Sequence, residues 1–411
     1  MSILVINAGS SSLKFGLFDD AAQQTLATGL IDWRHDPHEA ELVIRPQHGE
    51  PIRSRESLRD HRKAVLHAIR RLDDLPNSDG SAKEKITAVG HRVVHGGVHF
   101  REPVRIDDNV KKRITELTEL APLHNPPALE AIEAAESALP NMPHIAAFDT
   151  SFFTTLEPCA FLYPVPYAWF TDWGIRRFGF HGISHAYCTG RAAEVLQREA
   201  KELRLVICHL GNGCSASAVY HGRAVRCTMG FTPLEGLMMG TRSGSIDPGV
   251  LLHVERRQNR TADQVDHALN AESGLLGISG LSSDYRTVQE AAKKGEERAK
   301  LALEMYADRV RSAIGAYAVT MGSLDALIFT AGVGEHAADL RAAACQGLEI
   351  LGLRLDASRN ENCKPDTDIA EANSPGRILV LQTQEELMIA REVRRILSSS
   401  DASAKSAQGA P

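Results

Sequence analysis

The sequence lacks a long apolar run and a strong excess of either charge. Its longest uncharged apolar stretch, CAFLYPVPYAWF at 159–170, contains two prolines and is too short to cross a bilayer. The N-terminus has no basic segment and breaks into NAGSSS after a few apolar residues, so it predicts neither a signal peptide nor an anchor. The net charge is −6 over 411 residues, and no lysine- and arginine-rich block is interleaved with aromatics. We therefore expect neither a membrane nor a nucleic acid as partner.

Cysteine is scarce and shows no pairing pattern. The seven cysteines are an odd number and include no C-x-x-C pair, which favours a reducing compartment in which they act as small buried apolar side chains. We therefore expect a cytoplasmic protein. A composition of 43% hydrophobic and 24% charged residues is ordinary for a globular protein, and the chain is long enough for two domains.

Two distant segments resemble each other. The stretches LVINAGSSSLKFGLF at 4–18 and VICHLGNGCSASAVY at 206–220 each read as an apolar strand, a polar glycine-containing turn and a second alternating strand. Short β-branched runs and long helical patterns alternate elsewhere, which favours an α/β or mixed fold. A chance match of two hairpins is one interpretation. The other is a duplicated fold in which each half begins with a hairpin whose tip faces a shared cleft.

A third glycine turn, LDALIFTAGVGEHA at 324–337, reads as a strand followed by a turn and a helix. Backbone N–H groups and a helix N-terminus meet anions in this context. None of the three turns is a Walker motif, and one glycine turn alone is usually only a turn. Three such turns, two of them opening the halves, indicate a nucleotide held between two lobes.

Glycine is also concentrated in MGFTPLEGLMMGTRSGSIDPG at 229–249, which contains five glycines and a lone Arg242 among small residues. Such a stretch cannot form a continuous helix, and ordering it is costly unless it serves a site. A guanidinium there suits the clamping of a transferring phosphoryl group. A long structural loop is the alternative.

Four further positions suggest chemistry. His181 and His185 in FGFHGISH could be zinc ligands, but H-E-x-x-H is absent and no third ligand is evident nearby. Arg92 lies among apolar strand residues, so either an internal carboxylate or a substrate carboxylate should hold it. Asp149 ends an apolar run, at the strand-end position where α/β proteins present functional groups.

The sequence closely resembles the acetate kinases. The resemblance covers residues 1 to about 398 and is carried by NAGSSSLKF, GHRVVHGG, FGFHGISH, HLGNGCS, MGFTPLEGLMMGTRSG, GLLGISGLSSDYR, FTAGVGE and EELMIA, in that order. It implies the two-lobed, duplicated actin-like (ribonuclease H-like) α/β fold of the sugar kinase, heat-shock chaperone and actin superfamily, with nucleotide in the interlobe cleft. The implied lobes are 1–150, joined by a C-terminal helix at 384–398, and a nucleotide-binding lobe at 151–383. Residues 399–411 are small, polar and aperiodic and should form a disordered tail.

The resemblance also implies a reaction and its cofactor. ATP would phosphorylate acetate to acetyl phosphate, reversibly and with Mg²⁺ or alternatively Mn²⁺, in a homodimer whose partners are the small-molecule substrates ATP, ADP, acetate and acetyl phosphate. A simple carboxylic acid is ionised at neutral pH, so the nucleophile needs no general base. Asp149 is therefore assigned to orienting an arginine or the magnesium shell.

The implied site residues fall into four groups. Asn7 and Glu385 would hold the metal, while Ser10, Ser12 and Lys14 would contact phosphate oxygens. Asp149, His181 and Arg242 would be catalytic, and Arg92, Val94, Leu123, Phe180 and Pro233 would bind the carboxylic acid. The nucleotide would be bound by His209, Leu210, Gly211, Asn212, Gly213, Asp284, Tyr285, Arg286, Gly332, Val333, Gly334, Glu335 and His336.

Three positions depart from the family pattern. Phe153 stands where a histidine is usual, Ser245 where an aspartate is usual, and His336 where an asparagine is usual. The loss of an acid at Ser245 could change how Arg242 is held, and His336 bears on the choice of nucleotide. Alternative functions are a propionate or other short-chain acyl kinase, a nucleotide-switched actin- or chaperone-like binding protein, and a metal-dependent hydrolase.

Overall fold

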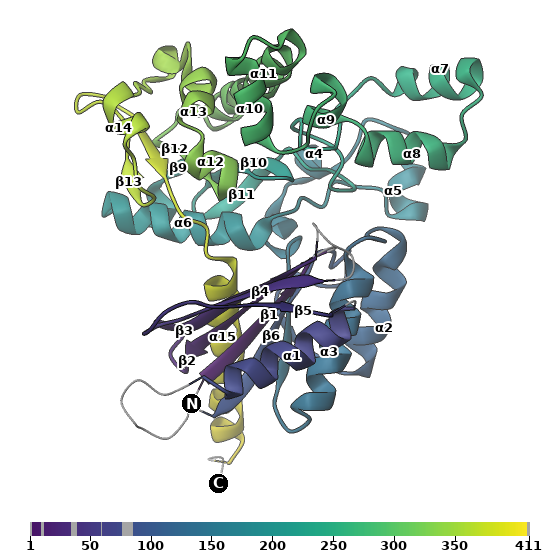
Figure 1. Ribbon diagram of the computed structural model, residues 1–411, viewed down its shortest axis with the longest axis vertical. Coiled ribbons are helices and arrows are strands. Elements are labelled where there is room, and N and C mark those ends of the chain that lie inside the picture. The colour runs from purple at the N-terminus through teal and green to yellow at the C-terminus, as the bar shows by residue number, and fades with distance from the viewer. Residues whose placement is uncertain (1, 10–11, 34–38, 59, 76–84, 409–411) are drawn as a thin grey trace. The chain divides into compact units, whose positions relative to one another are not determined.

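The structure is a computed structural model that describes residues 2–9, 12–33, 39–58, 60–75 and 85–408. The chain divides into two compact units. Unit 1 consists of Met1–Ser151 and Gln384–Pro411, and unit 2 consists of Phe152–Thr383. Each unit is a mixed sheet with helices (Figure 1).

Unit 1 contains an eight-stranded sheet in the order β5-β4-β3-β2-β1-β6-β8-β7. Its first hairpin is antiparallel, and β1, β6 and β8 run parallel. The strands are β1 (Ser2–Ala8), β2 (Ser12–Asp19), β3 (Thr25–Asp32), β4 (Ala40–Pro46), β5 (Ile52–Glu56), β6 (Ile86–Val93), β7 (Val104–Arg105) and β8 (His144–Phe148).

Helices cover both faces of this sheet, which explains why every residue of β1 is buried. Leu4 and Ile6 belong to the core formed with helices α1 (His61–Asp73) and α3 (Asn125–Ala138). On the other face, a Cβ added at Gly90 would meet Ile389 of helix α15 (Glu385–Gln408) at 2.7 Å. Gly90 thus allows α15 to pack closely on the strands. The remaining helices are α2 (Asp108–Glu116) and the 3-10 turn η1 (Leu117–Glu119).

Unit 2 contains a six-stranded sheet in the order β11-β10-β9-β12-β14-β13. Its strands are β9 (Arg204–Leu210), β10 (Cys214–Tyr220), β11 (Arg223–Cys227), β12 (Ala326–Thr330), β13 (Thr367–Asp368) and β14 (Arg377–Val380). Its helices are α4 (Pro158–Phe161), α5 (Ala168–Trp173), α6 (Gly182–Leu196), α7 (Pro248–Gln258), α8 (Ala262–Ala271), α9 (Gly274–Ser279), α10 (Tyr285–Lys293), α11 (Glu297–Met321), α12 (Ala331–His336), α13 (Ala338–Cys345) and α14 (Ala357–Glu361), with 3-10 turns η2 (Ser151–Thr155), η3 (Ala200–Glu202) and η4 (Leu348–Leu351).

The two sheets share one topology. In unit 1 the strands β3-β2-β1 form an antiparallel meander that continues into the parallel pair β6-β8, and in unit 2 the strands β11-β10-β9 continue in the same way into β12-β14. The similar segments 4–18 and 206–220 are the first hairpins of the two sheets. The duplicated α/β fold expected from the sequence is therefore confirmed.

The C-terminal segment differs from the expectation of a disordered tail. Helix α15 continues to Gln408, so it includes most of residues 399–411. Alanine, lysine and glutamine in DASAKSAQ have good helix propensity, and a helix already nucleated by packing extends at little cost. Among the described residues, no helix combines the length and apolarity needed to cross a membrane.

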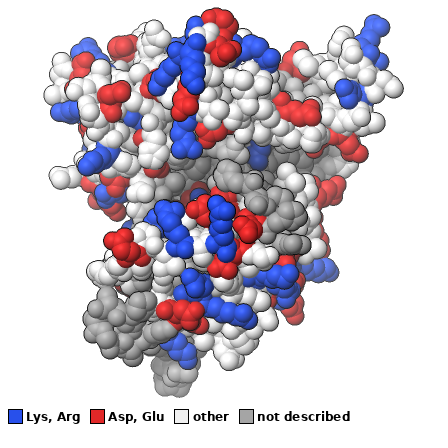
Figure 2. Space-filling model, in the orientation of Figure 1, with Lys and Arg blue, Asp and Glu red and all other residues white. Residues whose placement is uncertain are grey.

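The visible surface agrees with the absence of a basic block in the sequence. On the face drawn in Figure 2, acidic and basic side chains of the described residues are interspersed within each unit. No continuous basic stripe stands out there among the described residues.

Candidate active site

The predicted residues of unit 1 gather at one edge of its sheet. Asn7 lies near the end of β1, Arg92 near the end of β6, and Asp149 directly after β8. Because these three strands are parallel neighbours, their carboxyl ends meet at the same edge. Helix α15 begins there with Glu385 and Glu386.

Arg92 and Asp149 form a buried bidentate ion pair. Arg92 Nε donates to Asp149 Oδ1 at 3.1 Å, and Nη2 donates to Oδ2 at 2.5 Å. Burial alone would lower the pKa of Arg92, but the nearby carboxylates, Asp149 first among them, raise that pKa above its ordinary value. Of the two partners that the sequence left open for Arg92, the structure shows an internal carboxylate.

Asn7 links this ion pair to the start of α15. Its Oδ1 accepts from Arg92 Nη1 at 3.1 Å, while its Nδ2 donates to Glu386 Oε1 at 2.9 Å and to Glu385 Oε2 at 3.4 Å. Glu386 was not among the predicted site residues, although it stands next to Glu385. Acidic residues in the first turn of a helix are common in any protein, because they interact favourably with the helix dipole, so Glu386 had no distinguishing signal in the sequence.

The other predicted residues of unit 1 differ in exposure. Lys14 pairs with Asn7 across the β1–β2 hairpin, so both side chains share one face of the sheet. Val94 is buried, whereas Leu123, expected as an apolar wall, is 59% exposed in the single chain. Ser12 is half-buried at the start of β2, and Ser10 lies outside the described residues.

In unit 2, His181 and Arg242 converge over one glycine. His181 precedes α6 with a left-handed φ of 59°. A Cβ added at Gly213 would lie 3.3 Å from His181 Nε2 and 3.7 Å from Arg242 Nη1. Gly213 therefore leaves room in front of two polar groups, room that any side chain would reduce.

Arg242 has no counterion in the part of the chain that the structure describes. Its Nη1 donates a hydrogen bond to the carbonyl of Pro233 at 3.4 Å. Burial lowers the pKa of Arg242 because nearby groups compensate its charge only weakly. A half-buried guanidinium without a described carboxylate partner is a suitable binding group for an anionic ligand.

The glycine-rich loop 229–249 is held by a half-buried cluster of three side chains. Arg177 Nη2 donates to Glu235 Oε1 at 2.5 Å, and the hydroxyl of Tyr163 donates to Glu235 Oε2. Arg177 Nη1 also donates to the carbonyl of Met229 at 2.9 Å. These contacts order the backbone that carries Pro233, and no local sequence pattern signalled Arg177 or Tyr163.

The nucleotide-binding stretches expected in unit 2 meet at the turn Gly211–Gly213. The α-carbon of Gly211 faces Ala331, the first residue of α12, because a Cβ added at Gly211 would lie 3.8 Å from the Ala331 Cβ. On the other side, Gly240 N donates to Asn212 O at 3.1 Å, and a Cβ at Gly240 would meet Ser283 O at 3.0 Å. The structure thus brings together Gly211–Gly213, the start of α12 and the segment before Asp284.

Residues of these stretches have distinct local roles. Asp284 caps α10 by accepting from Thr287 N at 3.1 Å, and Tyr285 is buried with its hydroxyl 3.3 Å from Asp339 Oδ2. His209 is buried at the end of β9, and its Nδ1 lies 2.8 Å from Ser184 Oγ. Arg286, Gly332 and His336 are exposed, Val333 is half-buried, and Leu210, Gly334 and Glu335 are buried.

Two of the departures from the family pattern have clear surroundings. Phe153 is fully buried, and its ring packs edge-on against the imidazole of His185 at a centroid distance of 5.7 Å. Ser245 Oγ accepts from Gly236 N at 3.1 Å, and Ser245 N donates back to Gly236 O at 2.9 Å. Ser245 therefore joins two parts of the loop that carries Arg242 by hydrogen bonds to Gly236.

The zinc interpretation of His181 and His185 gains no support. Both imidazoles bond to the same serine hydroxyl, Ser215 Oγ, at 2.9 and 2.8 Å. Within the described ranges, no group of three or more His, Cys, Asp or Glu side chains could hold a metal ion.

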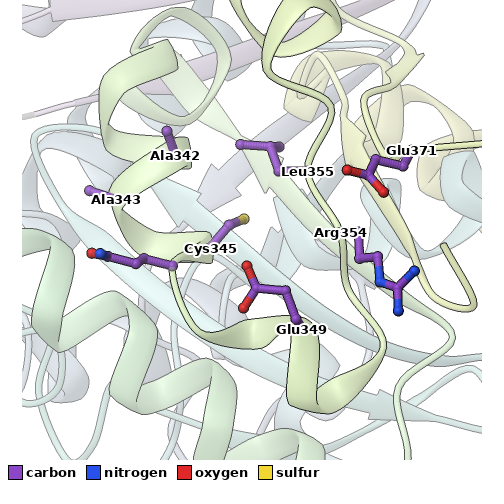
Figure 3. Close-up of a pocket in the computed structure, with 8 residues that line it drawn as sticks. Ala342, Ala343, Cys345, Glu349, Arg354, Leu355 and Glu371 are labelled. Carbon is purple, nitrogen blue, oxygen red and sulfur yellow. The ribbon is translucent and has the colours of Figure 1, made fainter.

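A separate pocket of about 490 Å³ lies in unit 2 near α13 and η4 (Figure 3). Cys345, Glu349, Arg354 and Glu371 are among the residues that line it. None of the predicted site residues contributes to its wall. The predicted site is therefore not this pocket.

Comparisons with known proteins cover nearly the whole chain. Residues 2–391 match the model of the acetokinase family. An acetate kinase of Gloeobacter violaceus is 50% identical over 403 residues, which are 95% of this chain and 98% of that protein. The crystal structure of Porphyromonas gingivalis acetate kinase matches with a TM-score of 0.87 at 39% identity, covering 96% of this chain and 99% of that one.

A propionate kinase structure from Francisella tularensis matches equally well in fold. Its TM-score is 0.87 at 38% identity, again with 96% of this chain and 99% of that chain covered. The family model matches nearly the whole chain, and one relative is identical at half of the aligned positions. Both findings agree with the sequence motifs and with the topology that the two sheets share. This chain belongs to the acetokinase family.

Proposed function

We propose that this protein transfers the γ-phosphoryl group of ATP to acetate, reversibly, giving acetyl phosphate and ADP. Membership of the acetokinase family and the half-identical acetate kinase support this reaction. The structural observation that carries it is Arg242, a half-buried guanidinium without an ion pair in the described chain, whose Nη1 converges with His181 Nε2 over Gly213. Phosphoryl transfer requires such positive donors around the equatorial oxygens of the transferred group.

Arg92 suits the binding of the acetate carboxylate. A guanidinium has five N–H donors, and the bonds to Asp149 and Asn7 use three of them. Two N–H groups, one on Nη1 and one on Nη2, remain for a ligand. Asp149 fixes the orientation of the Arg92 guanidinium. Because the nucleophile is already ionised and needs no general base, this orienting role is the one assigned to Asp149.

The chemical step then needs alignment and charge, with no proton transfer. An acetate oxygen attacks the γ-phosphorus, a new O–P bond forms, and the bond from the γ-phosphorus to the bridging oxygen of ADP breaks. Arg242 and His181 donate to the phosphoryl oxygens as charge moves through them. The protein groups finish the reaction in their starting protonation states.

The cluster of Asn7, Glu385 and Glu386 fits a magnesium ion. The carboxylates of Glu385 and Glu386 supply oxygen ligands, which Mg²⁺ prefers over nitrogen and sulfur, while Asn7 Oδ1 accepts from Arg92 in this structure. Glu385 is buried, and the direct hydrogen bonds from Asn7 Nδ2 give the neighbouring carboxylates fixed positions. When bound, the ion would neutralise charge on the phosphate oxygens. Mn²⁺ has the same oxygen preference and is the alternative.

The adenine nucleotide would bind along the turn Gly211–Gly213 of unit 2. This turn adjoins the start of α12, where backbone N–H groups are free of helix partners, and the segment that leads into α10. Asp284 and exposed Arg286 lie at the start of α10. His336 ends α12 on the surface, where it can affect the choice of base.

Propionate is the second candidate substrate. The structure of a propionate kinase has the same TM-score, 0.87, as that of an acetate kinase. Val94 and Phe180 are buried apolar residues of the expected pocket, which suits a short alkyl group. One additional methylene changes binding in an apolar pocket by only about 1–3 kcal/mol. We expect acetate to be preferred, with propionate accepted.

The reverse reaction tests this proposal. Purified protein, acetyl phosphate, ADP and Mg²⁺ should yield ATP, detected with luciferase, and propionyl phosphate should yield it with a lower kcat/KM. Chelation by EDTA should stop the reaction, and Mn²⁺ should restore it. An absence of ATP from both acyl phosphates would refute the proposed function, while a preference for propionyl phosphate would change only the substrate.

Two properties of the family are also proposed for this chain. We expect a homodimer in the cytoplasm, with no nucleic acid or membrane partner. The apolar side chains of Tyr167 and Trp173 in unit 2 are 65% and 66% exposed within the single chain, which supports a covered surface there. Light scattering at micromolar concentration would measure twice the chain mass of 44.8 kDa for a dimer.

A further inference from the structure

A chain of hydrogen bonds runs behind His181, on the side opposite the face that meets Gly213. His181 Nδ1 lies 2.9 Å from Ser215 Oγ, and Ser215 Oγ lies 2.8 Å from His185 Nε2. His185 Nδ1 lies 2.8 Å from Ser217 Oγ. Ser215, His185 and Ser217 are fully buried, so their polar groups have no access to water and depend on one another.

We propose that Ser215 and His185 are positioning residues for the phosphoryl transfer, because they fix the ring of His181 and, when Ser215 donates to Nδ1, keep its proton on Nε2. This inference rests on the proposed function, in which His181 donates to a phosphoryl oxygen. It assigns a role to two residues that make no contact with substrate in that function. We refer to Ser215, His185 and Ser217 as the relay.

The donors and acceptors of the relay allow two proton orders. In the first, Ser217 donates to His185 Nδ1, His185 Nε2 donates to Ser215, and Ser215 donates to His181 Nδ1, so a neutral His181 carries its proton on Nε2. In the second, every one of these bonds is reversed, and His181 Nδ1 donates to Ser215. In the reversed order only an imidazolium presents an N–H at Nε2, because a neutral His181 would then have its single proton on Nδ1. Donation to a phosphoryl oxygen therefore requires the first order or a protonated His181.

The relay works only if His185 has one proton, so that one of its nitrogens accepts. Burial lowers the pKa of His185 well below its ordinary value, and the neighbouring imidazole of His209 lowers it further. Phe153 adds to this burial, because its ring packs against His185. The aromatic residue at position 153, where the family usually has histidine, thus favours a neutral His185 in this chain.

The same arrangement restrains the ring of His181 on its flat side. His181 stacks on His209 with ring centroids 4.1 Å apart and an interplanar angle of 23°. Stacking alone would still allow the His181 ring to rotate within its own plane. The hydrogen bond between Nδ1 and Ser215 prevents this rotation. His181 Nε2 is then held in a position from which it and Arg242 Nη1 both face the space next to Gly213.

A double-mutant cycle tests the relay. Ser215→Ala should lower kcat for acetyl phosphate formation by about 10- to 100-fold with little change in the KM of acetate or ATP. His181→Ala should lower kcat more. In the His181→Ala background, Ser215→Ala should change kcat by less than about twofold, because it has no ring left to position. Equal effects of Ser215→Ala in both backgrounds would overturn the proposal, as would an unchanged kcat in the single variant.

Further variants separate folding from positioning. Ser374→Ala removes a buried hydroxyl that bonds to Gly352 O at 3.0 Å and Gly376 O at 2.7 Å, away from the site, and should leave kcat unchanged. If Ser215→Ala does not fold, Ser217→Ala replaces it in the same cycle, with an expected loss of roughly 3- to 10-fold that also disappears without His181. A wild-type protein that makes no acyl phosphate would instead refute the proposed function itself.

Discussion

Asp149 holds Arg92 from one side of its guanidinium, with Nε to Oδ1 at 3.1 Å and Nη2 to Oδ2 at 2.5 Å, at the adjacent ends of two parallel strands. The pairing leaves part of the guanidinium fork for a second anion. It also explains how a carboxylate can serve a reaction that needs no base. The acid determines where the arginine points, and the arginine holds the nucleophile.

Asp149→Asn tests this relationship. An amide can accept from only one of the two Arg92 donors, and its NH₂ group faces the other donor. We expect kcat/KM for acetate to fall by about 10²-fold, mainly through KM, because the fork is misplaced. Steady-state kinetics with acetate as the varied substrate measure this. An Asn variant with near-full activity, beside an inactive Asp149→Ala variant, would show that position rather than charge is the contribution of Asp149.

Arg242 and Arg92 should differ when each is replaced by alanine. Arg92→Ala leaves Asp149 buried without its counterion, so the free energy of unfolding should fall by about 3–5 kcal/mol. Arg242→Ala leaves no described carboxylate unpaired, so thermal stability should be kept while kcat falls by about 10³-fold or more. Calorimetry and kinetics on both variants measure this contrast. A loss confined to KM in Arg242→Ala would contradict its assigned role.

Gly213→Ala should impair catalysis without unfolding the protein. The added Cβ would lie 3.3 Å from His181 Nε2 and 3.7 Å from Arg242 Nη1, in the space assigned to a phosphoryl oxygen. Gly213 has no left-handed φ that alanine would find strained. We expect a fall in kcat of about 10²-fold with an unchanged melting temperature. Gly190→Ala, which has open space around its Cβ, is the matched control.

Stability should fall in mild acid because of buried histidines, which include His185 and a pair in unit 1. His91 Nε2 lies 3.0 Å from His144 Nδ1, and burial lowers the pKa of both imidazoles below the ordinary 6.5. Below about pH 6.5 the unfolded chain binds protons that the folded chain excludes, so the free energy of unfolding decreases as the pH falls. The decrease should approach about 1.4 kcal/mol per pH unit for each such histidine, until the folded pKa is reached.

Urea unfolding at pH 7.5, 6.5 and 5.5 measures that slope. His91→Gln should reduce it by roughly the share of one histidine. A free energy of unfolding that is constant between pH 7.5 and 5.5 would show that the pair does not titrate in this way.

The sequence predicted the features that local patterns encode. The echo between 4–18 and 206–220 identified both hairpins, because strand alternation and turn residues are local signals. The apolar run before Asp149 placed that residue at a strand end for the same reason. Most of the other candidate site residues were implied by the resemblance to the acetate kinases and not by such local patterns.

Pairings between distant residues could not be predicted in this way. The partner of Arg92 is 57 residues away in the sequence, and Ser215 is 34 residues from His181. Tertiary packing alone brings these atoms together, and no local spacing records it. The helix through residues 399–408 was missed for a related reason, since its polar composition resembles that of disordered segments while its start is stabilised by packing in unit 1.

The most direct test of the function is the trapping of acyl phosphate with hydroxylamine. Mg-ATP is incubated with acetate, propionate, butyrate or no carboxylate, and hydroxamate and ADP are measured in each sample. We predict acetohydroxamate in the highest yield, matched by ADP in equal amount, and little ADP without a carboxylate. Slow ADP release that is equal in every sample, with no hydroxamate, would contradict the kinase account and favour a nucleotide-switched binding protein.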